Sequence, residues 1–297
     1  MRCFLLALIF LFSCSEGIKT LPSSTGTNSE VIFVVNDALW ELEIDTLVRN
    51  TFGAAIQGLT QKETIFRVVQ INHSEFKSIL KTHKNIVIIT EGTKTVSHKN
   101  KWANGQFVAN LGLDDNLSNL EQSLKKLREI FVLKEVKSIR KSFAKFSQKK
   151  VEKTLKVNFK IDCIVPKEYE IIENNKSFFW ANYDPQQSDE IKNILTFVFT
   201  PNSVNLQEEV LQKTDSIFAK YLIGIQAGSY VKIEQAYPPY YFENTYRGLW
   251  KLENGFMGGP FLIKTYFVED KIVVNVGLIF APQSRKRKYI KELEAIL

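Results

Sequence analysis

Apolar and polar positions alternate in blocks that predict strands and helices from residue 31 onward. Continuous β-branched runs predict buried strands at 31–35 and 85–90. Between them, apolar residues at helical spacing predict a helix over 36–52, which Asn36 and Asp37 can cap. The remaining elements predicted in this half are strands at 66–71 and 106–111 and a short helix at 74–83.

The longest periodic stretch, 115–150, contains neither Pro nor Gly and predicts one long helix. Its apolar stripe moves around the helix, and Lys and Arg occupy the other face. Residues 124–160 hold 13 Lys or Arg and 3 Glu, whereas the whole chain has a net charge of +7. The chain is therefore one basic segment on an acidic body.

The second half reads as seven strands and two helices. The strands are predicted at 155–165, 178–183, 194–200, 230–234, 248–252, 261–268 and 271–281, and the helices at 205–222 and 285–297. This order predicts an α+β fold, a mostly antiparallel sheet with helices packed on one face. We expect an N-terminal half over 31–150 and a C-terminal half over 151–297. The strand–helix order of 31–52 resembles that of 195–222, so the halves are either related or alike by chance.

The first residues have the parts of an export signal. Arg2 precedes an uncharged apolar run over 4–12, which is too short to span a bilayer as a helix. Cys14 follows Ser13, as in a bacterial lipobox, so residues 1–13 are predicted to be a signal peptide and Cys14 the site of lipid attachment, with acyl chains such as palmitate. The alternative is an ordinary cleaved signal with Cys14 there by chance.

Export and anchoring define the expected location and partners. Residues 14–30 are small and polar and predict a short flexible tether after the lipidated cysteine. Ser15, rather than Asp, follows Cys14, which favours the outer membrane over the inner one. We therefore expect a membrane partner through the lipid anchor, a further envelope protein or anionic surface as partner, and no nucleic acid.

No motif for catalysis or for a metal or cofactor is found in the sequence. The three histidines lack ligand spacing, and neither a phosphate-binding loop nor a Gly-x-Ser-x-Gly motif is present. Five Ser-x-x-Lys matches occur, but without the Lys-Thr-Gly companion of penicillin-recognising enzymes they carry no weight in so lysine-rich a chain. After loss of the signal and lipidation of Cys14, Cys163 would be the remaining thiol, and its strand-like surroundings predict a buried, inert side chain.

Two segments are candidate binding sites. On the basic helix, Lys134, Lys137, Arg140 and Lys141 would dock on an anionic surface, or simply form a solvated helix face. In the second half, an aromatic loop and a Gly-Gly turn supply Tyr241, Arg247, Trp250, Gly258 and Gly259. These five residues would contact a ligand, with Arg247 as an anion fork, or form a structural hairpin.

Several short motifs resemble the domain-of-unknown-function 4837 family. They are LPSSTG at 21–26, WE at 40–41, WANGQ at 102–106, RGLW at 247–250, FMGGPF at 256–261 and the terminal segment 280–297. The resemblance extends over nearly the whole mature chain. It implies a lipoprotein of Bacteroidota-type bacteria without an assigned activity, and it assigns no catalytic residues.

Two functions follow as hypotheses. The first is a cell-envelope lipoprotein that acts as a non-catalytic binding or assembly module. The alternative is an envelope hydrolase of wall or glycan material, with a site built from Arg247, Glu243, Asp184 and Tyr241 if these residues meet in the fold.

Overall fold

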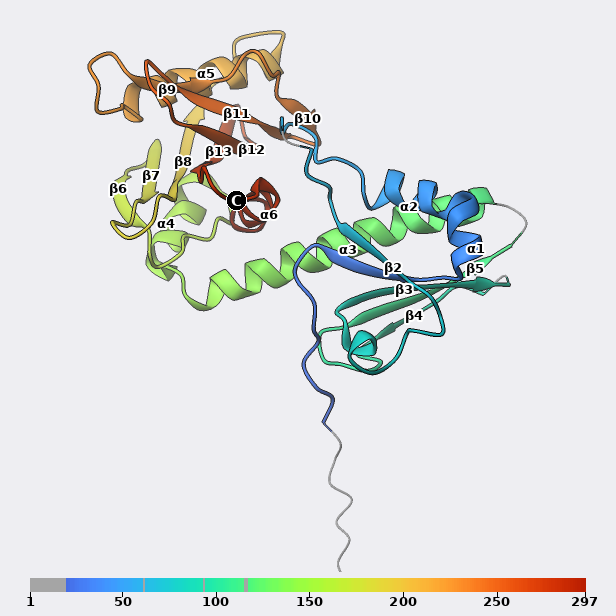
Figure 1. Ribbon diagram of the computed structural model, residues 1–297. Coiled ribbons are helices and arrows are strands. Elements are labelled where there is room, and N and C mark those ends of the chain that lie inside the picture. The colour runs from blue at the N-terminus through green and yellow to red at the C-terminus, as the bar shows by residue number, and fades with distance from the viewer. Residues whose placement is uncertain (1–19, 61, 93, 115–116) are drawn as a thin grey trace, which may run out of the picture.

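Two β-sheets form separate halves of the molecule, and one long helix, α3 (Leu117–Lys145), runs from the first half to the second (Figure 1). Figure 1 is a computed structural model, which describes residues 20–60, 62–92, 94–114 and 117–297. The predicted signal peptide and Cys14 lie outside the described residues. The α+β class predicted from the sequence is confirmed.

The N-terminal half is built on a five-stranded sheet of order β2-β1-β3-β5-β4. Its strands are β1 (Glu30–Val34), β2 (Arg67–Ile71), β3 (Asn85–Glu91), β4 (Val96–Lys99) and β5 (Phe107–Leu113). The pairings among β1, β2, β3 and β5 are parallel, and β4 alone pairs antiparallel. Both faces of β1 and β3 are buried, which explains their continuous apolar runs.

Helices cover one face of this sheet. They are α1 (Asp37–Leu39), a π-helical turn η1 (Trp40–Ile44), α2 (Asp45–Thr51) and α3. Asn36 caps the first turn as predicted, because its side chain accepts a hydrogen bond from the Ala38 amide. On the other face, the helix predicted at 74–83 is only a 3₁₀ turn, η2 (Ser78–Thr82), which packs with Phe76 and Trp102.

The C-terminal half is an eight-stranded sheet of order β10-β11-β12-β13-β8-β7-β6, with β9 paired to β11, and all its pairings are antiparallel. Its strands are β6 (Glu170–Asn174), β7 (Phe178–Tyr183), β8 (Ile191–Phe199), β9 (Tyr230–Ile233), β10 (Tyr240–Phe242), β11 (Thr245–Glu253), β12 (Gly258–Val268) and β13 (Lys271–Phe280).

This second sheet carries helices on both faces. Val274 and Val276 of β13 pack toward α5 (Leu206–Tyr221), whereas Val273 and Ile279 pack toward α4 (Lys149–Phe159) and α6 (Lys286–Ile296). The expectation of helices on one face thus holds for the five-stranded sheet and is wrong for this one.

Strand direction also separates the two halves. Over the described residues, eight of the eleven strand pairings are antiparallel, as expected, but the three parallel ones all lie in the N-terminal sheet. The strand β1 lies between two parallel neighbours, and its supposed counterpart β8 between two antiparallel ones. The similar strand–helix order does not extend to a shared sheet topology.

The segment after α3 corrects two sequence predictions. The long helix ends at Lys145, and the strand predicted at 155–165 does not form, since α4 continues to Phe159 and residues 160–165 are in neither a helix nor a strand. Leu155 and Phe159, one helical turn apart, are buried against the sheet, and Lys160 ends α4 in a left-handed conformation. Cys163 is buried as predicted, and burial raises the pKa of its thiol to about 12, which keeps it unreactive.

Candidate functional site

Two of the four candidate basic residues on α3 are engaged inside the protein. Lys134 Nζ donates hydrogen bonds to Lys84 O (3.2 Å) and Asn85 Oδ1 (3.3 Å) and lies 6.0 Å from the centre of the Phe107 ring. Burial, with the nearby Lys84 charge, lowers the pKa of Lys134 to about 8. Lys134 therefore joins α3 to the end of the five-stranded sheet and is not available to a partner.

We expect the Lys134→Met variant to remove a pH dependence of stability. Charged Lys134 is disfavoured in the folded protein, so the free energy of unfolding should rise as pH increases from about 8 to 10.5. The stability of the wild type relative to Lys134→Met should therefore rise by about 1–2 kcal/mol from about pH 7 to about pH 10, after allowance for solvent screening. Urea unfolding of both proteins at the two pH values measures this. Lys137→Met, at an exposed position of the same helix, should show no such change.

Arg140, the second of these inward residues, joins α3 to the C-terminal half. Its guanidinium donates to Ala295 O (2.6 Å) and Asp162 O (2.8 Å) and pairs with the Asp162 carboxylate at 2.9 Å. By contrast, Lys137 and Lys141 are exposed and have no ion-pair partner among the described residues. Of the four predicted residues, only Lys137 and Lys141 can therefore contact a partner.

Arg247 also bridges the two halves. Its Nη2 donates to Glu294 Oε1 at 2.7 Å and its Nη1 to Gln57 O at 3.4 Å, while its Nε has no hydrogen-bond partner among the described residues. A Cβ atom on Gly58, where φ is +85°, would lie only 2.3 Å from Arg247 O, so the N-terminal half approaches β11 closely here. Arg247 therefore forms an ion pair within the C-terminal half and a hydrogen bond to the N-terminal half, and it is not a free anion fork.

The remaining predicted residues form a structural hairpin beside a small hollow. Trp250 is buried and its indole donates to Ile279 O at 3.2 Å, and a Cβ on Gly259 would lie 2.0 Å from the same carbonyl. Trp250, Gly258 and Gly259 line one hollow of about 340 Å³. Tyr241 lies elsewhere, on the edge strand β10, where its hydroxyl bonds Asn244 Oδ1 at 3.2 Å.

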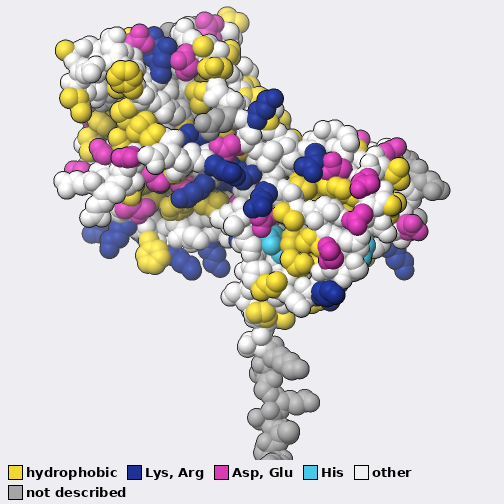
Figure 2. Space-filling model, viewed as in Figure 1, with side chains coloured by type: hydrophobic (Ala, Val, Ile, Leu, Met, Phe, Trp, Pro, Cys, Tyr) yellow, Lys and Arg dark blue, Asp and Glu magenta, His cyan; other side chains and the backbone are white. Residues whose placement is uncertain are grey.

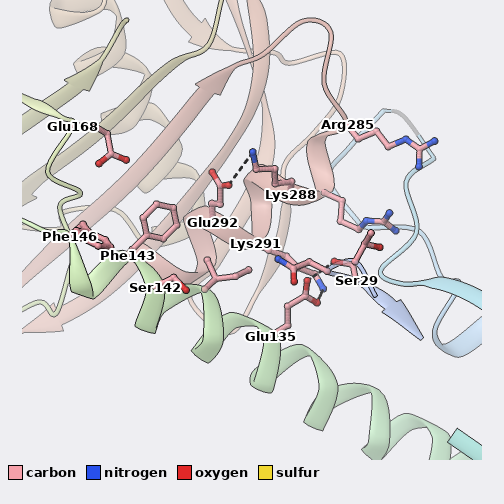
Figure 3. A pocket seen from close by; sticks show the side chains of 14 residues that line it. Ser29, Glu135, Ser142, Phe143, Phe146, Glu168, Arg285, Lys288, Lys291 and Glu292 are labelled. Atoms are coloured by element: carbon pink, nitrogen blue, oxygen red, sulfur yellow. Dashed lines mark hydrogen bonds and ion pairs between the residues drawn. The ribbon is translucent and has the colours of Figure 1, made fainter. Parts of the chain in front are cut away.

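The larger hollow is a cleft of about 690 Å³ between α3, α6 and the start of β1. We call it the interdomain cleft. Figure 3 shows Phe143 and Phe146 at one end, Arg285 at the other, and Glu135 and Lys291 between them. Glu135 accepts a hydrogen bond from Ser29 Oγ (2.7 Å) and forms a buried ion pair with Lys291.

Comparisons with known proteins identify both halves. Residues 147–297 match the model of a family described as a domain of unknown function, DUF4837, which is more than half of the chain. The chain belongs to the DUF4837 family. Residues 24–144 match a second domain of unknown function, DUF8532. The resemblance seen in the sequence is therefore confirmed, but the DUF4837 match is confined to the C-terminal half, and the motifs at 40–41 and 102–106 fall in the DUF8532 match.

Other comparisons add little to this assignment. No curated protein matches this DUF4837 protein in sequence. Among solved structures, the lipid transfer and protein localization domain of human StarD13 (DLC2) matches at 11% identity, over 43% of this chain and 86% of that chain, with a TM-score of 0.20. A TM-score this low supports no argument about fold or function.

The structure of this DUF4837 protein adds a surface that the sequence prediction missed. The turn from α3 to α4 carries Lys145, Phe146, Lys149, Lys150 and Lys153, all of them exposed. We call these five residues the elbow surface. Phe146 is 71% exposed, although it continues the apolar stripe of the helix pattern. The basic run was visible in the sequence. The prediction of an unbroken helix over 115–150, however, did not include the turn that exposes this run.

Among the described residues, no three His, Cys, Asp or Glu side chains are grouped so that they could hold a metal ion. Over the same residues, no helix combines the length and the apolar character needed to cross a bilayer.

Proposed function

We propose that this protein is a lipid-anchored cell-envelope protein that docks on an anionic bilayer through its elbow surface and serves as a non-catalytic binding or assembly module. The observation that carries the proposal is an exposed phenylalanine flanked in sequence by exposed lysines, of which Lys149 also pairs with Glu152 at 3.0 Å. An aromatic ring can enter the interfacial region of a bilayer while neighbouring lysines contact anionic headgroups.

The position of the elbow surface supports this orientation. In Figure 1 the described chain begins below the N-terminal half, and the turn between α3 and α4 forms the lower edge of the C-terminal half. Figure 2 shows basic side chains gathered around a hydrophobic one at that lower edge. Cys14, the proposed lipid site, is six residues before Thr20, the first described residue. A short tether would keep this side of the protein near the membrane.

The hydrolase alternative has no geometric support. Asp184 follows β7, whereas Tyr241 lies on β10, and four strands separate these two in the sheet. Arg247 is paired with Glu294. Asp184 is therefore remote from Tyr241, Glu243 and Arg247, which lie on the β10–β11 hairpin.

Vesicle binding tests the proposal. The full chain carrying Cys14→Ser, which cannot be lipidated, is sedimented with vesicles of phosphatidylglycerol and phosphatidylcholine. We expect Lys145→Gln/Lys149→Gln/Lys150→Gln to weaken binding about 100-fold at low salt, since each lysine near an anionic surface contributes about 1 kcal/mol.

A matched variant controls for net charge. Lys94→Gln/Lys99→Gln/Lys271→Gln removes the same charge from exposed sites outside the elbow surface and should bind almost as well as the parent protein. Binding of the parent should also decrease with salt, because exposed charges are screened. The proposal is wrong if the parent protein does not bind anionic vesicles or if the two triple variants bind them with equal affinity.

A further inference from the structure

We infer that the interdomain cleft binds a single-chain anionic amphiphile, a molecule with one acyl chain and a carboxylate or phosphate head. The cleft volume of about 690 Å³ lies within the range of small-molecule sites. Its two ends differ in chemistry, as Figure 3 shows. The cleft shares Phe146 with the elbow surface but none of its lysines, and the inference does not depend on membrane docking.

One end of the cleft suits an acyl chain. Ile139, Phe143 and Phe146 line it; Ile139 and Phe143 are one turn apart on α3, and Phe146 directly follows the last residue of that helix. Phe143 also packs against the main core of the C-terminal half, so this wall is firmly held. Removal of an acyl chain from water against such a wall is favourable in proportion to the apolar area buried.

The other end suits an anionic head. Arg285 lies there, just before α6, and Arg287 and Lys288 line the cleft from the first turn of that helix, with Lys288 beside Glu292. Arg285 is exposed and has no ion-pair partner among the residues that the structure describes. Arg285 and Arg287 also line an adjoining hollow of about 570 Å³ with Arg49 and Arg67. In Figure 2 basic side chains gather between the two halves of the molecule.

The acidic residues of the cleft leave the Arg285 end positively charged, and they set the orientation of the ligand. Glu135 is engaged by Lys291 and Ser29, and Glu292 lies between Lys192 (3.5 Å) and Lys288 (3.7 Å). Glu63, in the adjoining hollow, accepts the amides of Lys286 and Arg287 at the start of α6.

Glu168 is the remaining acidic residue, and it is exposed at the apolar end beside Phe146. Its charge would repel an anionic head there. The head therefore lies at Arg285 and the acyl chain along α3.

Calorimetric titration of the full Cys14→Ser chain tests the inference, with ligands kept below their micelle concentrations and no bilayer present. Dodecanoate and dodecyl phosphate represent the two head chemistries, dodecyl maltoside is the uncharged amphiphile, and inorganic phosphate is the head without a chain. We expect one molecule of a dodecyl anion to bind, and neither dodecyl maltoside nor inorganic phosphate to bind measurably. Binding of only one dodecyl anion would support the site and assign its head class.

Variants locate the binding. Arg285→Gln/Lys288→Gln should weaken binding of the dodecyl anion about tenfold, because two partly exposed charges are removed. Ser142→Trp places a large side chain in the cleft from an exposed helix position and should abolish binding. Gln122→Trp, at an exposed position near the other end of α3, and Lys94→Gln/Lys99→Gln should leave affinity unchanged.

Three results would overturn the inference. They are no binding of either dodecyl anion, equal affinity for dodecyl maltoside, and an affinity unaffected by both cleft variants. The elbow lysines are intact in every protein of this titration, and no vesicle is present. A negative titration therefore does not affect the vesicle-binding result, and a negative vesicle result does not affect the titration.

Discussion

Glu135→Ala is expected to lower the free energy of unfolding by about 3–5 kcal/mol, because it leaves a buried lysine without its carboxylate. Glu135 lies on α3 and its partner Lys291 on α6, so the ion pair joins the two halves. Their side chains are only 9% and 5% exposed. Burial already lowers the pKa of Lys291, while Glu135 acts to raise it.

The surroundings of Lys291 only partly substitute for Glu135, because Glu294 also favours the charged lysine but less strongly than Glu135 does. Its ammonium lies 4.4 Å from the centre of the Phe66 ring, a contact that holds a cation but accepts no ordinary hydrogen bond. Removal of Glu135 would also leave the Ser29 hydroxyl without the acceptor it now has. The variant therefore loses an ion pair and a hydrogen bond at one buried site between the halves.

Urea unfolding, followed by far-UV circular dichroism and by tryptophan fluorescence, measures this effect and shows whether the halves unfold together. Glu129→Ala, at an exposed position of the same helix, should change stability by less than about 0.5 kcal/mol. Glu135→Leu/Lys291→Met should recover much of the loss, since an apolar pair can replace a buried ion pair. Equal stability of Glu135→Ala and Glu129→Ala would contradict the assigned role of the ion pair.

Phe131→Ala should destabilise the N-terminal half by about 3–5 kcal/mol, the usual effect of truncating a fully buried phenylalanine. Phe131 is the residue by which α3 enters the core of the five-stranded sheet. Its ring lies 5.4 Å from that of Phe107, 5.8 Å from that of Phe52 and 6.2 Å from that of Phe66, all at steep interplanar angles. Such edge-to-face contacts add to the loss of buried area.

The neighbouring apolar residue provides the control. Leu133 is two positions further along α3 and is 57% exposed, so Leu133→Ala should leave the urea midpoint almost unchanged. Both changes shorten an apolar side chain on one helix, and only their burial differs. A similar midpoint for the two variants would show that α3 does not hold the N-terminal core through Phe131.

Local patterns in the sequence anticipated most of the elements. The β-branched runs at β1 and β3, the Asn36 cap and the spacing of α5 are local features, and each appears in the fold as expected. The sequence patterns missed the short strands β4, β6 and β10, and the predictions at 155–165 and 74–83 were wrong. There the tertiary contacts of Leu155 and Phe159, and of Phe76, determine the backbone.

The candidate site was predictable only as a set of residue types. Lys134, Lys137, Arg140 and Lys141 are equally basic in the sequence, yet Lys134 and Arg140 face inward, because a carbonyl or carboxylate from a distant segment meets each of them. For the same reason, the sequence alone was consistent with Arg247 as an anion fork, whereas in the structure Arg247 is paired with Glu294. The periodicity of the sequence around Arg247 carries no information about its contact with Glu294, which is 47 residues away.

Four properties could be predicted from local information, namely the α+β class, the buried state of Cys163, the basic segment and the membership of the DUF4837 family, since each depends on composition, on short motifs or on neighbours within a few turns. Long-range contacts were needed to establish the direction of the N-terminal strands, the placement of helices on both faces of the second sheet, the elbow surface and the interdomain cleft. Those features depend on which distant segments come into contact, and packing free energy, not local propensity, selects these contacts.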